Sequence, residues 1–126
     1  QVNFIASWNG TSWLPMGTGL NDHPHALVVL PSGDLLVGGF FTTAGGVTAR
    51  RLALWNGAAW SEFGGGANGA VYALTVLPGG DVVAAGAFTT IGGVNANRIA
   101  RWNGSTWSPL GSGFTLEVRA LAQVPG

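Results

Sequence analysis

The hexapeptide Leu52-Ala53-Leu54-Trp55-Asn56-Gly57 decides the fold of this chain, because it occurs three times. Ile5-Ala6-Ser7-Trp8-Asn9-Gly10 precedes it and Ile99-Ala100-Arg101-Trp102-Asn103-Gly104 follows it, so that each copy starts 47 residues after the one before. About half of the positions in residues 5–51 are identical in residues 52–98, and no insertion separates the two copies. A fixed period of this length is the signature of a repeat architecture.

Each repeat predicts four short strands rich in aliphatic and aromatic residues. In the middle copy the expected strands are residues 71–77, 82–88, 98–102 and 105–110. Pro78-Gly79-Gly80-Asp81 is a turn signal, since glycine supplies the positive φ that a tight reversal needs. Asn103-Gly104 predicts a two-residue type I′ turn between the last two strands. No stretch has a sustained period of 3.6 residues, so we expect no helix.

Four antiparallel strands in each repeat of about 40 to 50 residues are typical of β-propeller blades. We therefore predict an all-β fold, a β-propeller segment of four-stranded antiparallel blades. Residues 1–126 form one repeat region, made of repeats 5–51 and 52–98 and a partial repeat 99–126. The region holds two complete blades and a split third, which lacks the equivalent of residues 80–94.

The turn predicted at Asn103-Gly104 also assigns faces to the tryptophans. It would place Trp102 opposite Ser105 and Ala100 opposite Trp107, with all four side chains on one face. We expect both tryptophans of each repeat to lie on the face that packs against the neighbouring blade. The residues concerned are Trp8, Trp13, Trp55, Trp60, Trp102 and Trp107. The alternative is a lectin-like role, in which exposed indoles stack on sugars and repeated weak sites gain avidity.

The motifs resemble those of a known family. Gly38-Gly39 and Ala85-Gly86 end the second strand and paired tryptophans follow, as in Kelch-type propeller repeats. The longer string from Ala87 to Gly104 is similar to repeats of large secreted or surface proteins of bacteria and of some fungal cell-surface proteins. The resemblance implies a non-catalytic scaffold or binding surface with an extracellular or cell-surface location.

Composition and charge exclude several classes of protein. The 126 residues include five Arg, no Lys, five acidic residues and no Cys, and the formal net charge is 0. A neutral chain without a basic cluster lacks the electrostatic features of a nucleic-acid binder. Without Cys there is no disulfide, thiolate metal site or thiol nucleophile. No apolar stretch approaches the roughly 20 residues of a membrane span.

Charged residues that recur in successive repeats are expected to be structural. Asp34 and Asp81 occupy the same Pro-x-Gly-Asp turn, and an enzyme would hardly repeat a catalytic acid in this way. Arg51 and Arg98 precede the third strand, where we expect hydrogen bonds or salt bridges to a turn carboxylate or to carbonyls. No catalytic triad, phosphate-binding loop or calcium loop can be assembled, so we predict no enzyme and no cofactor.

Residues that differ between repeats are better candidates for ligand binding. His25, Tyr72 and Arg119 are equivalent positions near the start of the first strand, and His23 lies two residues before His25. If this strand is innermost, these side chains line the mouth of the central channel; otherwise they are variable surface positions. Two histidines beside Asp22 suggest a metal site, but the sequence offers no third ligand, and none is predicted.

The expected partners are further blades, because propellers typically have four or more. These blades belong either to a longer parent chain, in cis, or to copies of the chain, in trans. If copies close a ring, each fills three blade positions and the blade number is a multiple of three. Joining the last strand of one copy to the first of the next would create a parallel pair or a gap, which favours a longer parent chain. A glycan or a protein is the expected ligand.

Overall fold

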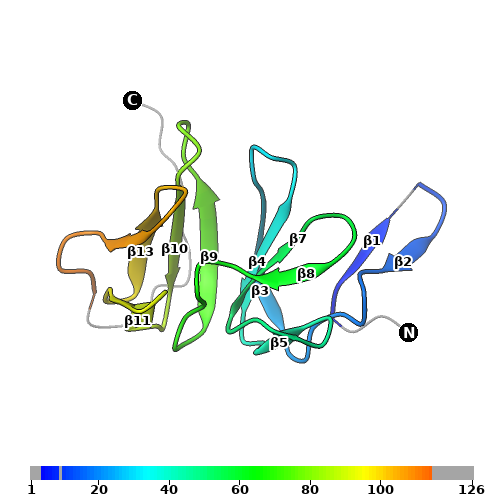
Figure 1. Cartoon of the computed structure of the whole chain (residues 1–126), viewed down its shortest axis with the longest axis horizontal. Helices are drawn as coiled ribbons and strands as arrows, with labels where there is room; N and C mark the ends of the chain where they lie inside the picture. The colour runs from blue at the N-terminus through cyan, green and yellow to red at the C-terminus, as the bar shows by residue number, and fades with distance from the viewer. Residues whose placement is uncertain (1–3, 9, 115–126) are drawn as a thin grey trace.

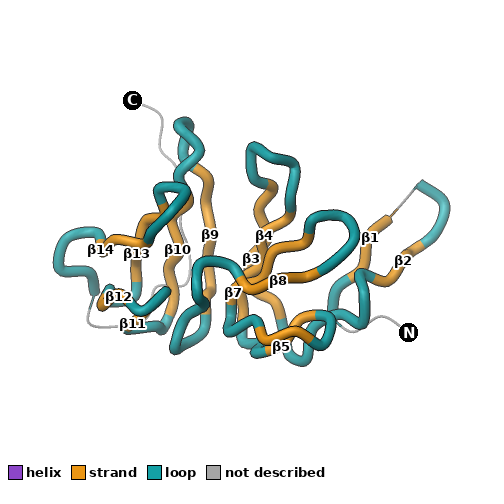
Figure 2. Tube along the Cα trace, in the orientation of Figure 1, coloured by secondary structure: helices purple, strands orange, loops and turns teal. Residues whose placement is uncertain are grey.

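The computed structural model describes residues 4–8 and 10–114, and their regular structure consists of strands alone (Figures 1 and 2). Two antiparallel four-stranded sheets contain eight of these strands. In spatial order, the first sheet comprises β3 (Pro24–Val29), β4 (Leu35–Gly39), β7 (Leu52–Trp55) and β8 (Trp60–Glu62). The second sheet comprises β9 (Val71–Val76), β10 (Val82–Gly86), β13 (Ile99–Trp102) and β14 (Trp107–Pro109). Within the described ranges no helix is present that could cross a membrane.

The remaining strands form three short hairpins. The pair β1 (Ala6–Trp8) and β2 (Trp13–Pro15) lies 47 residues before β7 and β8 and is the outer half of another blade. The segment after the second strand of each sheet, expected to be a loop, is itself a hairpin. These hairpins are β5 (Thr43–Ala44) with β6 (Val47–Thr48), and β11 (Thr90–Ile91) with β12 (Val94–Asn95). Two complete blades and part of a third are thereby confirmed, whereas the expected last strand lies outside the described residues.

The predicted register of the last hairpin is wrong. Trp102 lies directly opposite Trp107 and not opposite Ser105, and the predicted pairing of Ala100 with Trp107 fails for the same reason. The two-residue turn is formed by Gly104 and Ser105, one position beyond the predicted Asn103-Gly104. Because residues directly opposite each other share a face, both indoles still project from the same side of the sheet.

The asparagine side chain causes this shift. Asn103 Oδ1 accepts hydrogen bonds of 2.9 Å from the main-chain N–H groups of the second and third residues after it. The Asn56 side chain makes the same two contacts, again at 2.9 Å. A side-chain oxygen therefore takes the place of the main-chain carbonyl that would close a type I′ turn. The glycine that follows supplies the positive φ, 101° at Gly104.

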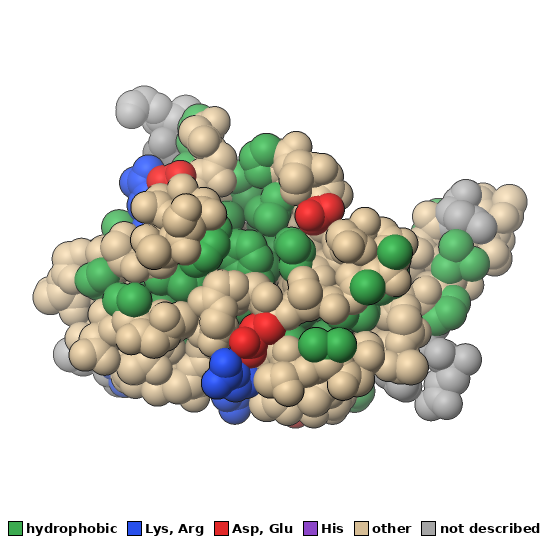
Figure 3. Space-filling view, in the orientation of Figure 1, with side chains coloured by type: hydrophobic (Ala, Val, Ile, Leu, Met, Phe, Trp, Pro, Cys, Tyr) green, Lys and Arg blue, Asp and Glu red, His purple; other side chains and the backbone are tan. Residues whose placement is uncertain are grey.

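The core lies between sheets rather than within one sheet. One cluster joins the β1–β2 hairpin to the first sheet and includes Ile5, Met16, Leu20, Val37, Phe41 and Trp60. The other joins the first sheet to the second and includes Leu36, Leu52, Phe63, Val71, Phe88 and Trp107. Figure 3 shows hydrophobic atoms filling the space between the two sheets. The sheets approach each other most closely at their first strands, β3 and β9, so these strands are the inner ones.

Glycines permit a close approach of strands at the end of β4 and of β10. A Cβ atom on Gly39 would strike the carbonyl oxygen of His23, and one on Gly86 would strike that of Ala70. Neither glycine has a positive φ. Lack of space, and not backbone conformation, therefore demands glycine at both positions.

We predict that Gly86→Ala lowers the free energy of unfolding by about 1–3 kcal/mol, because the atoms in the way belong to the backbone and cannot rotate aside. Gly79→Ala is the matched control: a Cβ there meets no atom within 4 Å, and the change should stay within about 0.5 kcal/mol. Urea unfolding of both variants measures the difference. Equal midpoints would contradict the steric explanation.

Candidate functional site

The tryptophans form three cross-strand pairs with ring centroids 5.1 to 5.3 Å apart, and the exposure of these pairs differs. Trp60 and Trp107 are only 6% and 4% exposed. Trp60 Nε1 donates a hydrogen bond of 2.7 Å to the carbonyl of Met16, in the connection that follows β2. Trp8 and Trp13 are 54% and 66% exposed, with no sheet in front of them in the described part of the chain. Packing between blades thus buries one indole in each of the two complete blades and leaves the first pair open.

The recurring arginines bond to carbonyls, one of the two alternatives left open above. Arg51 Nη1 donates to the carbonyl of Ala67 at 3.4 Å, and Arg98 Nη1 donates to that of Phe114 at 3.2 Å. Both residues have a left-handed backbone, with φ of 66° and 69°, and so does Phe4, with 68°. No sequence signal indicates this backbone conformation, because arginine and phenylalanine rarely adopt it.

The recurring aspartates occupy the predicted turns. The carbonyls of Asp34 and Asp81 accept hydrogen bonds of 2.9 and 2.7 Å from the main-chain N–H groups of Leu30 and Leu77. The Asp81 carboxylate also accepts a 2.8 Å hydrogen bond from Nε of Arg101, a residue of the second blade. The main-chain hydrogen bonds close the two turns, and the Asp81–Arg101 contact links the β9–β10 turn to β13.

The variable residues His25 and Tyr72 lie on β-bulges. The register of β3 shifts between Pro24 and Ala26, which leaves His25 as the extra residue. The register of β9 shifts in the same place one repeat later, and Tyr72 is the extra residue there. Bulges redirect side chains and are common beside functional sites. The third equivalent, Arg119, lies outside the described residues.

The rings of His25 and Tyr72, from adjacent blades, contact each other, and the ring of Phe40 contacts both. The ring centroids are 4.9 Å apart for His25–Phe40, 5.2 Å for His25–Tyr72 and 5.6 Å for Phe40–Tyr72, all in edge-to-face orientation. Phe40 is 42% exposed. These three residues are called the aromatic cluster below. Phe40 was not among the predicted site residues, although its equivalent in the next repeat is Ala87 and the position is therefore a variable one.

His23 does not belong to this cluster. Its Nδ1 lies 3.0 Å from Oδ1 of Asp22, and its ring packs 4.7 Å from that of Phe4. The hydrogen bond from the His23 side chain, and then that from its main-chain N–H, lowers the pKa of the Asp22 carboxyl below its usual value. Across the described residues no three His, Cys, Asp or Glu side chains gather as metal ligands would.

Residues 78–105 match a family model described as "Domain of unknown function (DUF5122) beta-propeller". The matched segment runs from the β9–β10 turn to the β13–β14 turn and contains β10 and β13, two of the four strands of the second sheet, with the β11–β12 hairpin between them. The first sheet has the equivalent four strands 47 residues earlier in the chain, and the two sheets pack against each other through a shared core. This chain is a segment of a β-propeller. No curated protein and no solved structure matches it.

The propeller geometry places the aromatic cluster on the inner strands of two adjacent blades, β3 and β9, with Phe40 just after β4. Inner strands border the central channel of a propeller. Since the three rings are partly exposed and come from different blades, they offer one amphipathic contact surface at this junction.

We predict that Phe40→Ala shifts the ring resonances of His25 in proton NMR spectra, because the cluster loses the ring 4.9 Å from the imidazole. The His23 resonances should remain in place, since the ring beside it is Phe4. The free energy of unfolding should fall by only about 0.5–1.5 kcal/mol, because Phe40 is exposed. An unchanged His25 spectrum would show that the cluster does not form in solution.

Proposed function

We propose that this propeller segment is a non-catalytic binding module whose ligand contacts the aromatic cluster. One observation carries the proposal: His25, Phe40 and Tyr72, which occupy two positions that vary between repeats, converge on one surface from two blades. The next repeat has Ala87 in place of Phe40 and Tyr72 in place of His25, so the fold does not require a particular side chain at either position. Side chains that vary between repeats, and that the fold does not require, lie together on one surface. This arrangement supports a role in binding a ligand.

A protein or peptide is the ligand that best suits the aromatic cluster. Partly exposed aromatic rings bury large apolar area on contact, and they lose little rotamer freedom because few side-chain torsions must be fixed. The cluster contains no carboxylate, and the acid nearest to it in sequence, Asp22, is engaged by His23. A Kelch-like subfamily and an extracellular or cell-surface location remain part of this proposal.

Carbohydrate binding is the second candidate, and the exposure of Trp8 and Trp13 favours it. Their rings lie 5.2 Å apart on an open face, and an exposed indole can stack on the apolar face of a sugar. The equivalent indoles Trp60 and Trp107 are buried and unsuited to this role. The two candidates therefore use different residues.

One array that carries both a peptide library and a glycan library separates these functions. We expect the 126-residue chain to select peptides with apolar side chains, and Phe40→Ala/Tyr72→Ala to lose them. Trp13→Ala should leave peptide selection unchanged and serves as the matched control. Glycan binding that is lost in Trp13→Ala and retained in the double variant would overturn the peptide proposal in favour of the lectin-like one.

The open Trp8–Trp13 face also supports a further blade as partner. In the two complete blades this face is covered by the connection from the preceding sheet, which carries Met16 or Phe63. A third copy of that connection follows β14, and its Leu110 is 37% exposed. The Trp8–Trp13 face and the connection with Leu110 therefore correspond to the two halves of the contact that joins the first sheet to the second. We propose that another blade of the same repeat covers each half.

Native mass spectrometry decides whether copies of this chain supply those blades. Assembly in trans predicts oligomers of the 12.8 kDa chain, with two copies filling six blade positions. Leu110→Glu should dissociate them, because a carboxylate would be buried against the indoles. Val29→Glu, at a 65% exposed position of an inner strand, is the control. A clean monomer would contradict assembly in trans and leave blades in cis as the partner.

A further inference from the structure

A second candidate site lies between the two complete blades, away from the aromatic cluster. A pocket of about 420 Å³ is lined there by Arg50, Arg51, Asn68 and Thr90, and the rest of its wall is mostly glycine. This volume lies within the range of about 300–1,000 Å³ that is usual for small-molecule sites. None of the three rings of the aromatic cluster lines it.

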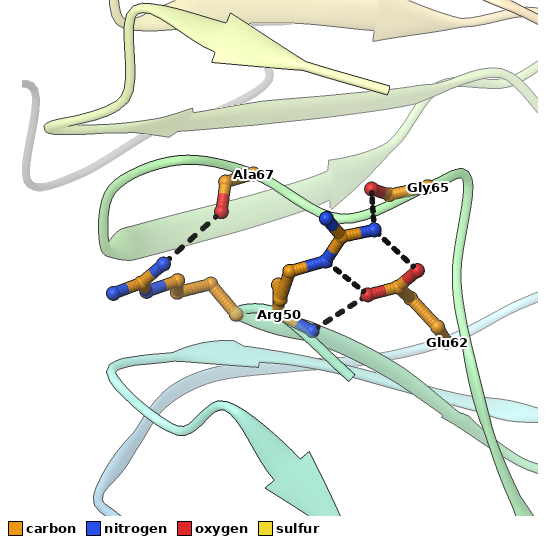
Figure 4. A network of polar contacts seen from close by, with 5 residues as sticks. Arg50, Glu62, Gly65 and Ala67 are labelled. Carbon is orange, nitrogen blue, oxygen red and sulfur yellow. Dashed lines mark hydrogen bonds and ion pairs between the residues drawn. The ribbon is translucent and has the colours of Figure 1, made fainter. Parts of the chain in front are cut away.

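One arginine of the pocket is held by a carboxylate. Arg50 Nε and Nη2 donate to the two oxygens of Glu62 at 2.9 and 3.1 Å, and Nη2 also donates to the carbonyl of Gly65 at 3.2 Å (Figure 4). The main-chain N–H of Arg50 donates to Glu62 as well, at 2.8 Å. The hydrogen bond from the Arg50 side chain lowers the pKa of the Glu62 carboxyl below its usual value. This two-point contact fixes the plane of the guanidinium.

The neighbouring repeats show that the fold does not require this network. In the following repeat Asn97, the equivalent of Arg50, donates from Nδ2 to the carbonyl of Ser112 at 3.4 Å, which reproduces the contact to Gly65. Three residues of the network differ from both neighbours at once. The first, middle and last copies have Asn3, Arg50 and Asn97; Pro15, Glu62 and Pro109; and Thr18, Gly65 and Ser112. An ion pair and a side-chain-free wall thus occur together at the junction that holds this pocket.

The second arginine carries a charge that has no counter-ion among the described residues. Glu62 offsets the charge of Arg50, whereas Arg51 makes only a long side-chain hydrogen bond to a carbonyl and no ion pair among the described residues. At the preceding junction the equivalent residue is Phe4, which packs on His23. A half-buried guanidinium in a concave wall favours a negatively charged ligand, and its planar fork matches carboxylate, sulfate and phosphate groups.

We propose that this pocket binds the oxyanion group of a small ligand, with Arg51 as the main contact and Arg50, oriented by Glu62, as the second. Gly93 leaves room at the wall for the rest of the ligand, because a Cβ atom there would meet no atom within 4 Å. Glu62 limits the positive charge of the pocket to one unit, which suits a singly charged group. This site does not depend on the proposed function of the aromatic cluster.

Calorimetric titration of the 126-residue chain with acetate, sulfate, phosphate and glucuronate at low ionic strength tests the proposal. We expect saturable binding of at least one probe, and at least about tenfold weaker binding by Arg51→Gln, which removes a charged hydrogen-bond donor. Arg98→Gln is the matched control: Arg98 has the same place in the repeat, the same left-handed φ and the same kind of carbonyl contact. It should leave the affinity within about twofold.

Two further variants keep the test decisive if Arg51→Gln fails to fold. Arg50→Asn copies the residue that the next repeat tolerates and frees the Glu62 carboxylate, so it should also weaken binding at least about tenfold. Glu62→Gln leaves both guanidiniums uncompensated and should strengthen binding severalfold. No saturable binding of any probe, equal losses in Arg51→Gln and Arg98→Gln, or weaker binding by Glu62→Gln would each overturn the proposal.

Discussion

The stacking of each sheet on the connection that leaves the preceding sheet is the contact on which the rest of this structure depends. Trp60 and Trp107 fill the junctions, and glycines leave the room for them: a Cβ atom on Gly45 or on Gly92 would lie 2.7 Å from the indole. Burying one indole removes about 150–250 Å² from water, roughly 4–6 kcal/mol as an upper bound. A single four-stranded sheet has no other way to bury both of its faces, so blades are stable only next to other blades.

The two junctions are not equivalent in their polar contacts. Trp60 Nε1 is bonded to a carbonyl, whereas Trp107 Nε1 is buried without a hydrogen-bond partner among the described residues. An unpaired buried donor costs about 1–3 kcal/mol. Phe63 packs against Trp102 and Trp107 at 5.0 and 6.1 Å, where the first junction has the smaller Met16. More aromatic contact offsets the missing hydrogen bond.

The same backbone arrangement that builds the blade also creates the aromatic cluster. Gly39 and Gly86 let the second strand approach the residues before the first strand, and the bulges at His25 and Tyr72 follow directly from this approach. The glycines are constant between the two repeats, and the bulged residues vary. The constant residues of the repeat thus build the blade, whereas the variable ones form the proposed contact surface. The Arg50–Glu62 network likewise lies at positions that differ between repeats.

Much of the fold was predictable from the sequence because it depends on local, periodic signals. The 47-residue period, the four strands of a blade and the Pro-x-Gly-Asp turns all follow from residues close together in the chain. The turn at Asn103 was placed wrongly, since Asn-Gly also occurs where the asparagine side chain, and not its backbone, closes the turn. The contact of Phe40 with Tyr72 of the next blade and that of Arg50 with Glu62 of the same blade stayed hidden, because no spacing rule links these residues.

The sequence by itself determined the blade, its repetition and the positions free to vary, because turn chemistry and strand alternation act within a single repeat. The tertiary structure decided which variable side chains meet. His25 and Tyr72 stand 47 residues apart, and their rings lie 5.2 Å from each other because two sheets stack at their inner strands. That distance depends on the packing of buried indoles between sheets, which fixes the angle and separation of the blades and has no counterpart in the local pattern of either repeat.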